Sequence, residues 1–253
     1  MIESINRTKY ERDYDPTILS AVNGTDLSEY FSKLKRIRLA FIRKYGHDRT
    51  VLDICCGPGE HLFRSRHSIE MGVGVDFSLR MIHAAESKKD VLNAANTEFV
   101  VSSARQIPFR EETFDLVYSF SSLYYVPQVE EVVLEAARLL KPKSIAILEL
   151  GNLYSLNTIV CRAYPELSVP CHIRIGDMSN VIRDAGLEVV ECRRFQILPL
   201  WGNRPKWLKP LLHPIWKKIL QRDISRKMLD ELICNMPILR CYCFRHIFIC
   251  KKM

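Results

Sequence analysis

The sequence predicts a doubly wound α/β fold, a parallel sheet with helices on both faces. Short apolar runs alternate with helical segments through the middle of the chain, which is the pattern of strands joined by crossover helices. The first of these runs ends in a glycine-rich turn. The length of 253 residues, with 47% hydrophobic and 26% charged residues, is that of a globular chain able to bury a large core.

Each element follows from local signals. The first strand, residues 51–55, is apolar and is stopped by Gly57-Pro58-Gly59. Ser78 is a plausible N-cap for a helix that runs through residue 86. Lys141-Pro142 stops a helix with apolar periodicity. We expect five strands over residues 51–55, 71–76, 98–102, 114–120 and 144–150, and helices over 60–67, 78–86 and 129–140.

Two segments fall where such folds bind ligands, at the carboxyl ends of the strands. The first is the turn from Asp53 to Gly59, whose glycines let the backbone approach a ligand closely. The second is Asp76, at the end of the second strand and 17 residues beyond Gly59. A carboxylate at that place accepts both hydroxyl hydrogens of a ribose. The alternative for Asp76 is a helix-capping or loop carboxylate.

Four stretches, residues 51–61, 72–82, 107–117 and 140–148, resemble the successive motifs of class I S-adenosylmethionine-dependent methyltransferases. The resemblance is strongest to the small-molecule branch, the methyltransferase type 11-like proteins that include quinone and sterol methyltransferases. It implies a Rossmann-like, seven-stranded sheet, mostly parallel with an antiparallel last strand. It also implies S-adenosyl-L-methionine as cofactor, and methyl transfer by in-line displacement to a small-molecule or lipid-like acceptor.

Carried over by position, the resemblance gives each cofactor residue a role. Gly57 and Gly59 would cradle the methionine end, and Asp53 would orient its amino group. Cys55 replaces the first glycine of the loop, and Ser103 stands where the family has an acidic residue that contacts the adenine amino group. Because a hydroxyl binds less strongly than a carboxylate, we expect weakened adenine recognition. The full implied cofactor set is Asp53, Cys55, Gly57, Gly59, Asp76, Phe77, Ser103, Ala104 and Ser119.

The chain is interpreted as a single methyltransferase domain, residues 1–253. An N-terminal cap, residues 1–48, contains Tyr10, Tyr14 and Tyr30 and an amphipathic helix over 27–45, the alternative for these tyrosines being surface packing. The remaining parts are a cofactor-binding core at 49–150, a substrate-side segment with the sixth strand at 151–200, a basic, Trp-rich helical insertion at 201–240, and the last strand at 241–253.

Three candidate catalytic residues flank the expected acceptor side. Tyr124 and Tyr125 follow the fourth strand, where they can shape the pocket or hydrogen-bond a substrate oxygen. His172 lies in an expected irregular segment, residues 152–176. Neutral imidazole accepts a proton near pH 7, so His172 is the candidate general base, although a lone loop histidine is more often structural. A base is needed only if the acceptor arrives protonated.

The insertion carries an apolar stripe that recurs every four residues from Trp207 to Leu220. Lys206, Lys209, Lys217, Lys218 and Arg222 flank the stripe, and residues 201–253 hold 12 basic against 3 acidic residues. Because of Pro210 and Pro214, a bent pair of short helices is expected. We favour packing on the domain as a pocket lid, and the alternative is a peripheral membrane contact through 201–222. The basic residues are otherwise a solvated face.

Other classes are disfavoured. No apolar run is long enough to span a membrane and the first residues lack a signal-peptide core, so a cytoplasmic protein is expected, with the membrane contact as an option. The odd number of cysteines, nine, indicates reduced thiols, and the spacing of Cys234, Cys241, Cys243 and Cys250 matches no common metal site. A nucleic-acid substrate is disfavoured because no RNA-binding module is recognisable. No pattern indicates an oligomeric state.

Two alternative functions remain. An NAD(P)-dependent oxidoreductase would need a third glycine in the loop, where Glu60, His61 and Leu62 follow Gly59 instead. A non-catalytic scaffold that keeps the cofactor loop is favoured only by the serine at position 103.

Overall fold

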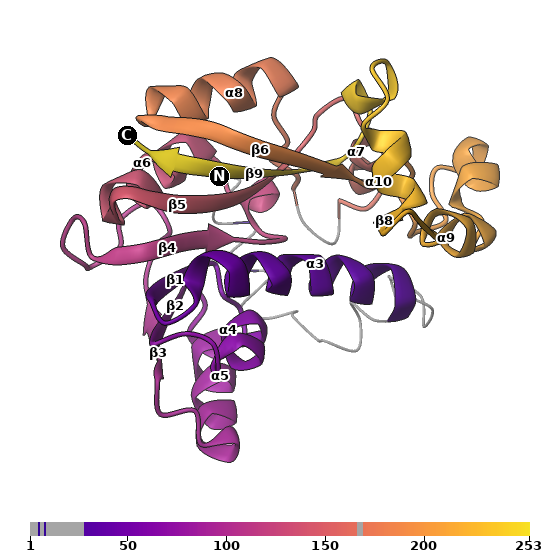
Figure 1. Cartoon of the computed structure of the whole chain (residues 1–253). Coiled ribbons are helices and arrows are strands. Elements are labelled where there is room, and N and C mark those ends of the chain that lie inside the picture. The colour runs from indigo at the N-terminus through magenta and orange to yellow at the C-terminus, as the bar shows by residue number, and fades with distance from the viewer. Residues whose placement is uncertain (1–4, 6–7, 9–27, 166–168) are drawn as a thin grey trace.

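The computed structural model describes Ile5, Thr8 and residues 28–165 and 169–253, and a seven-stranded sheet forms its centre (Figure 1). The strand order is β3-β2-β1-β4-β5-β9-β6. All pairs are parallel except those of β9, which runs antiparallel to β5 and β6. The predicted fold class is confirmed. The strands are β1 (Thr50–Ile54), β2 (Met71–Asp76), β3 (Thr97–Val101), β4 (Phe114–Ser119), β5 (Leu140–Gly151), β6 (Leu187–Phe195) and β9 (Arg245–Lys252).

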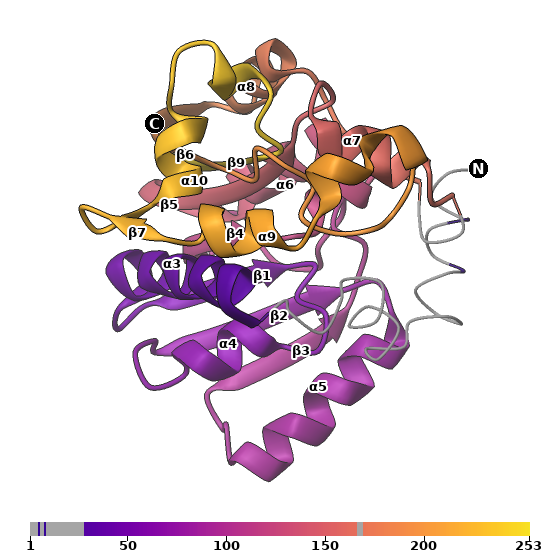
Figure 2. The same ribbon diagram turned by 90° about the vertical axis from the view of Figure 1, so that its right-hand side faces the viewer.

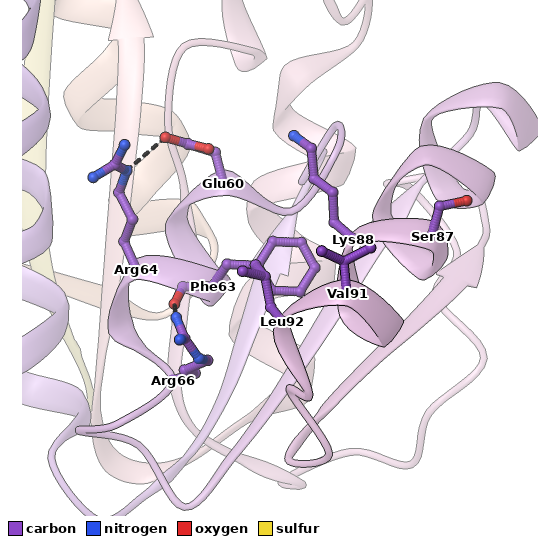
Figure 3. Close-up of a pocket in the computed structure, with 8 residues that line it drawn as sticks. All are labelled: Glu60, Phe63, Arg64, Arg66, Ser87, Lys88, Val91 and Leu92. Atoms are coloured by element: carbon purple, nitrogen blue, oxygen red, sulfur yellow. Dashed lines mark hydrogen bonds and ion pairs between the residues drawn. The ribbon is translucent and has the colours of Figure 1, made fainter.

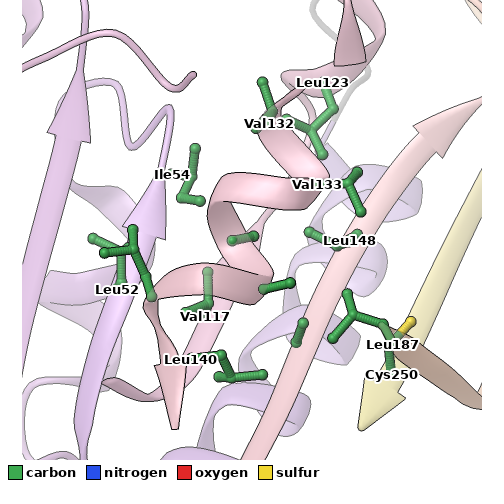
Figure 4. Packing of buried hydrophobic residues seen from close by; sticks show 14 of the residues in the cluster. Leu52, Ile54, Val117, Leu123, Val132, Val133, Leu140, Leu148, Leu187 and Cys250 are labelled. Carbon is green, nitrogen blue, oxygen red and sulfur yellow. The ribbon is translucent and has the colours of Figure 1, made fainter. Parts of the chain in front are cut away.

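Helices cover both faces of the sheet and bury a separate apolar cluster on each (Figure 1). One face carries α3 (Ser28–Gly46), α4 (Glu60–Ser65) and α5 (Leu79–Leu92). The other carries α6 (Val129–Leu139) and α8 (Ile175–Asp184). Figure 4 shows Val132 and Val133 of α6 against Leu52, Val117 and Leu148 of the sheet, all fully buried. Burial of this kind supplies most of the free energy of folding.

Several element boundaries differ from those expected, each for a local reason. Helix α5 runs six residues beyond residue 86, to a left-handed C-cap at Asn93. Strand β5 begins at Leu140 and contains Pro142, because its pairing with β4 shifts between Phe114 and Leu116. The expected irregular segment 152–176 contains a helix, α7 (Leu156–Arg162), and the start of α8. A short 3-10 turn, η1 (Leu123–Tyr125), follows β4.

The C-terminal half of the expected cap is α3, which starts one residue later than predicted and lies on a face of the sheet. Tyr30 is fully buried, and its hydroxyl donates a hydrogen bond to Asp230 of the insertion. Surface packing is therefore wrong for Tyr30. Tyr10 and Tyr14 lie outside the described residues.

The insertion folds as a series of short elements at the carboxyl edge of the sheet (Figure 2). The predicted bent pair is confirmed as η2 and α9, with Pro210 inside η2 and Pro214 capping α9. Leu208, Leu212 and Leu220 of the stripe are buried against the domain. The elements are η2 (Lys206–Leu212), α9 (Ile215–Leu220), the hairpin β7 (Asp223–Ile224) and β8 (Lys227–Met228), α10 (Leu229–Cys234) and η3 (Leu239–Cys241).

Three residues of the insertion differ from the expected pattern. Lys217 is 7% exposed, so it does not belong to a solvated basic flank. Trp207 and Ile215 project outward, with 67% and 50% of their surfaces exposed.

Among the described helices, none has the length and hydropathy needed to cross a bilayer. Within the same residues, no three His, Cys, Asp or Glu side chains are grouped so as to hold a metal ion.

Candidate functional site

The loop between β1 and α4 turns through three left-handed residues, Cys55, Gly57 and Gly59. Their φ angles are +59°, +52° and +75°. A Cβ on Gly59 would lie 2.7–2.8 Å from ring atoms of Phe99 and Phe63, so only glycine fits. A Cβ on Gly57 would meet no atom within 4 Å, so the backbone there faces open space. Cys55 adopts a left-handed conformation that glycine takes readily, at a cost in backbone strain.

Asp76 joins the end of β2 to this loop. Its Oδ2 accepts a hydrogen bond from the Gly57 N–H at 2.9 Å, and its Oδ1 accepts one from the Ser78 N–H at 3.0 Å. The side chain is nearly buried, with 7% of its surface exposed. The two segments that the sequence analysis singled out therefore meet at one edge of the sheet. Helix capping alone does not describe Asp76, because one of its oxygens is bonded to the loop.

A cavity of about 270 Å³ opens beside Asp76 at the carboxyl edge of β2 and β3. Six of the predicted site residues line it: Cys55, Asp76, Phe77, Ser103, Ala104 and Tyr125. The sequence did not point to the other lining residues, which are Val75, Val101, Ser102, Arg105, Val126 and Pro127. Position along the chain could have identified them, because each lies within two residues of a predicted residue at the end of β2 or β3 or after β4.

Asp53 lies beneath the loop with 1% of its surface exposed. Its Oδ2 has no well-formed hydrogen bond in the described part of the chain, and the neighbouring Tyr118 hydroxyl is also without a partner there. Burial, and then the charge of Asp76, raise the pKa of the Asp53 carboxyl well above its ordinary value, and the Tyr118 hydroxyl lowers this pKa only in part. An unpaired buried acceptor is costly unless a ligand donor or a water completes it. Asp53 is therefore a candidate acceptor for a cationic or N–H group bound at the loop.

Ser119 occupies the end of β4 but uses its hydroxyl within the fold. The side chain is fully buried, and Oγ donates to the Ile54 carbonyl at 2.7 Å. This bond ties the end of β4 to the end of β1. Ser119 is therefore placed to hold the two strand ends together beneath the loop, and its hydroxyl hydrogen is not available to a ligand in this arrangement.

Tyr124 and His172 form a ring cluster with Phe244 next to Gly151 at the end of β5. The Tyr124 hydroxyl accepts a hydrogen bond from Nη1 of Arg245 at 2.9 Å. Tyr125 instead turns to the cavity, with its ring centroid 4.7 Å from that of Tyr124. The three candidate catalytic residues are thus split between the cavity wall and a buried cluster beside it.

His172 is buried in an environment that opposes protonation. Its Nδ1 lies 2.7 Å from the Thr158 hydroxyl, and its Nε2 is buried without a hydrogen-bond partner among the described residues. Burial, assisted by Arg162 and Arg245, lowers the pKa of His172 to about 3. An imidazole with so low a pKa is a weak base at neutral pH. These surroundings argue against the general-base role expected from the sequence and favour a packing role beside the acceptor side.

Replacing His172 with Gln should reduce the acid sensitivity of folding. The unfolded chain binds a proton at His172 below about pH 6.5, whereas the folded chain does so only near pH 3, so stability is complete above pH 6.5 and falls as the pH drops. The slope from this one group is at most about 1.4 kcal/mol per pH unit. Urea unfolding at pH 7 and pH 5 measures it. An equal loss in wild type and H172Q would contradict the assignment.

A second hollow, about 550 Å³, lies on the outer side of α4 and α5 (Figure 3). Its two arginines are already engaged locally: Arg64 Nε bonds Glu60 Oε1 at 2.5 Å, and Arg66 Nη1 donates to the Phe63 carbonyl at 2.7 Å. It contains none of the predicted site residues. The smaller cavity beside Asp76 is the better site, because it combines a nearly buried carboxylate with the glycine loop at the strand ends.

Known proteins are similar in sequence to the part of the chain that forms this site. Residues 51–143 match the family model described as a methyltransferase domain. A demethylmenaquinone methyltransferase of Oceanobacillus iheyensis is 34% identical over 96 residues, 37% of this chain and 40% of that protein. The corresponding protein of Lactococcus lactis is 33% identical over 96 residues, 37% of this chain and 38% of that protein. The alignments thus span about two fifths of the length of these curated relatives.

Solved structures with the same fold extend over the whole chain. Magnesium protoporphyrin IX methyltransferase of Synechocystis, with bound S-adenosylhomocysteine, has a TM-score of 0.64 at 14% identity and 100% coverage of both chains. A putative methyltransferase of Haloferax volcanii, in complex with the Trm112 activator, has a TM-score of 0.62 at 19% identity and 96% coverage of both. Residues 51–143 thus match a methyltransferase domain in sequence, and the strand order belongs to a fold that this chain shares with solved methyltransferase structures.

Proposed function

We propose that this chain binds S-adenosyl-L-methionine at the glycine loop and the adjoining cavity, and transfers its methyl group to a small-molecule acceptor. The observation that carries the proposal is the bond between Asp76 at the end of β2 and the N–H of Gly57 in the loop. This bond brings two groups to the rim of one cavity: a carboxylate suited to bind ribose hydroxyls, and a glycine backbone that a ligand can approach closely.

The residues present fit this cofactor. The unpaired Oδ2 of Asp53 is an acceptor for the ammonium group of the methionine end, directly or through the loop. Asp76 offers its carboxylate to the two ribose hydroxyls. Phe77, Ala104 and Tyr125 line a cavity of the size and polarity that an adenine ring requires, with Ser103 as its polar member. When bound, the cofactor supplies a methyl group activated by a sulfonium.

The protein's own contribution is alignment and exclusion of water. In-line displacement requires that the acceptor atom, the methyl group and the sulfur lie in one line, and positioning accounts for most of the rate. Tyr125 on the cavity wall and the buried ring cluster of Tyr124 and His172 give that region a rigid apolar lining. With His172 so weak a base, the acceptor is expected to arrive with a free lone pair or as an anion.

The acceptor class is supported by the names of similar proteins. The curated relatives described above act on demethylmenaquinone, and the Synechocystis protein acts on magnesium protoporphyrin IX. Both are small organic molecules. We therefore place the acceptor of this chain among small molecules.

Calorimetric titration with S-adenosylhomocysteine and, separately, with NADH tests the cofactor. We expect micromolar binding of S-adenosylhomocysteine and no binding of NADH, because the loop lacks the third glycine of dinucleotide-binding proteins. Binding of NADH alone would replace the proposal with an oxidoreductase. A folded protein that binds neither ligand would refute it.

We further propose that the insertion contacts an anionic membrane surface, which would give access to a lipid-like acceptor. Trp207 and Ile215 are exposed, and Lys206, Lys209 and Lys218 beside them are exposed as well. Aromatic and aliphatic side chains ringed by lysines are typical of interfacial helices. The buried Lys217 takes no part in this surface.

Vesicles that contain phosphatidylserine test the membrane contact. The double variant Trp207→Ser/Ile215→Ser should bind them about tenfold more weakly than wild type, because it removes two apolar anchors. The matched control is Val91→Ser on α5, where an equally apolar side chain is 81% exposed but lies on another part of the molecule. Equal sedimentation of all three proteins with the vesicles, or of none, would refute the contact.

A further inference from the structure

Arg245 is a buried arginine at the carboxyl edge of the sheet. As the first residue of β9 it pairs with Gly151, the last residue of β5, and with Phe195, the last residue of β6. Because β9 is antiparallel, its first residue lies at the edge where the parallel strands end. This is the edge that carries Asp76 and the glycine loop. The side chain is 10% exposed.

The two guanidinium groups in this region, those of Arg245 and Arg38, outnumber the carboxylates that they contact directly. Glu149 is fully buried and is shared by two arginines, because Arg38 donates to it through Nε and Nη2 at 2.9 and 2.8 Å and Arg245 donates through Nη1. The other nearby carboxylate, Asp230, bonds the Tyr30 hydroxyl and two backbone N–H groups instead. One carboxylate therefore faces two guanidinium groups. A buried excess positive charge is costly unless an anion completes it.

The guanidinium has one nitrogen left for a ligand. Nε donates to Gln196 Oε1 at 2.7 Å, and Nη1 donates to Glu149, to the Tyr124 hydroxyl and to Ser121 Oγ. Nη2 has no acceptor among the residues that the structure describes. A fixed guanidinium with a free N–H edge is the protein group best suited to bind a carboxylate or another anionic oxygen.

The same guanidinium is tied to the cofactor loop through the segment after β4. Ser121 and Tyr124 in this segment bond Arg245, and Ser122 Oγ between them donates to the Cys55 carbonyl at 3.3 Å. Tyr125 at its end lines the cavity beside Asp76. Arg245 and the loop are thus both hydrogen-bonded to one short segment, residues 121–124. That is the position of a group that would hold the acceptor while the cofactor occupies the cavity.

Aromatic rings surround the cation. Its central carbon lies 5.9 Å from the ring centroid of Phe31, 5.3 Å from that of Tyr124 and 5.3 Å from that of Phe244. Such rings hold the guanidinium in place and offer an apolar lining to a bound organic molecule. The combination is that of a site for a molecule with an apolar body and one anionic group.

We propose that Arg245 is a specificity-determining residue that binds an anionic oxygen of the methyl acceptor, which makes the acceptor an organic anion with an apolar body. The inference rests on the proposed methyltransferase function. The group recognised is a carboxylate or a similarly charged oxygen, and Nη2 of Arg245 is the donor. Glu149 and Arg38 act on the acceptor only through Arg245, as positioning residues.

The test uses carboxylate probes and their neutral amides on the protein saturated with S-adenosylhomocysteine. Benzoate is paired with benzamide, and hydrocinnamate with hydrocinnamide, in calorimetric or NMR titrations. At least one carboxylate should bind about 10- to 100-fold more tightly than its amide, as expected for a charge-assisted hydrogen bond. Arg245→Gln should remove this preference. The variant should fold, because Glu149 keeps its two bonds from Arg38.

Two controls separate the possible failures. Arg194→Gln, the same change at a surface-side arginine on β6, should keep the preference for carboxylates, because Arg194 bonds Asn235 and a backbone carbonyl. Arg245→Gln should also bind S-adenosylhomocysteine as wild type does. Equal binding of carboxylates and amides by wild type, or a preference that survives in Arg245→Gln, would refute this inference. Failure of wild type to bind S-adenosylhomocysteine would instead refute the proposed function.

Discussion

Replacing Asp76 with Ala should weaken binding of S-adenosylhomocysteine by about 3 kcal/mol, or roughly 100- to 200-fold. The carboxylate is expected to accept a hydrogen bond from each of the two ribose hydroxyls. Hydrogen bonds to a charged acceptor are stronger than those between neutral groups. It also accepts the Gly57 N–H, so its removal frees the loop. Calorimetric titration of wild type and D76A measures the effect.

Asp115→Ala is the matched control for this change. Asp115 is also a strand aspartate, but it lies near the start of β4, at the opposite edge of the sheet. There its carboxylate accepts hydrogen bonds from the Thr50 N–H and from Lys141. D115A should bind S-adenosylhomocysteine within about twofold of wild type, since it lies far along the strand from the loop. Equal affinities of D76A and wild type would remove Asp76 from the site.

Gly59→Ala should destabilise the protein by about 3 kcal/mol, because the new methyl group meets a filled space and the backbone stays left-handed. The colliding rings, Phe63 and Phe99, are 3% and 8% exposed and pack on each other, so neither can move into solvent. Urea unfolding measures the loss. The distorted loop should also weaken S-adenosylhomocysteine binding.

Gly186→Ala separates backbone strain from collision. Gly186 has nearly the same φ, +76° against +75° for Gly59, but a Cβ there meets no atom within 4 Å. G186A should therefore cost only about 1 kcal/mol, the penalty of the left-handed conformation alone. If both variants lost the same stability, the packing of the two phenylalanines against the loop would not be the reason for a glycine at position 59.

The order of the elements was predictable because local signals agree with the fold. The β2 strand was expected over the six residues that form it, and Ser78 caps α5 through the Met81 N–H as predicted. The meeting of Asp76 with the glycine loop was also predictable, since parallel strands bring their carboxyl ends to one edge. The positions of these elements and the meeting of Asp76 with the loop both depend on the spacing of residues along the chain.

The acceptor side was less predictable because its contacts join distant segments. Arg38 and Glu149 are 111 residues apart, and Arg245 is a further 96 residues along the chain. No local pattern marks such a network, although a Glu inside the apolar run of β5 was a signal that went unused. The burial of His172, which lowers its pKa, likewise depends on residues that surround it only in the folded chain.

The inward side of the insertion was partly predictable. The four-residue repeat identified Leu208, Leu212 and Leu220 as one stripe. All three are buried against the domain, Leu208 and Leu212 in one apolar cluster and Leu220 in another. The periodicity of the apolar residues does not indicate which of the flanking lysines is buried, so the sequence did not predict the burial of Lys217. The β7–β8 hairpin is two residues long on each side and carries no strand pattern in the sequence.

Transfer of label from methyl-tritiated S-adenosylmethionine tests the central claim most directly. The protein is incubated with the labelled cofactor and the small-molecule fraction of a cell extract, and radioactivity is followed by extraction and chromatography. We predict a labelled compound of low molecular mass that appears with wild type and is absent with D76A. A protein that binds S-adenosylhomocysteine but releases no label to any fraction would contradict the account, and would favour a cofactor-binding scaffold on the same fold.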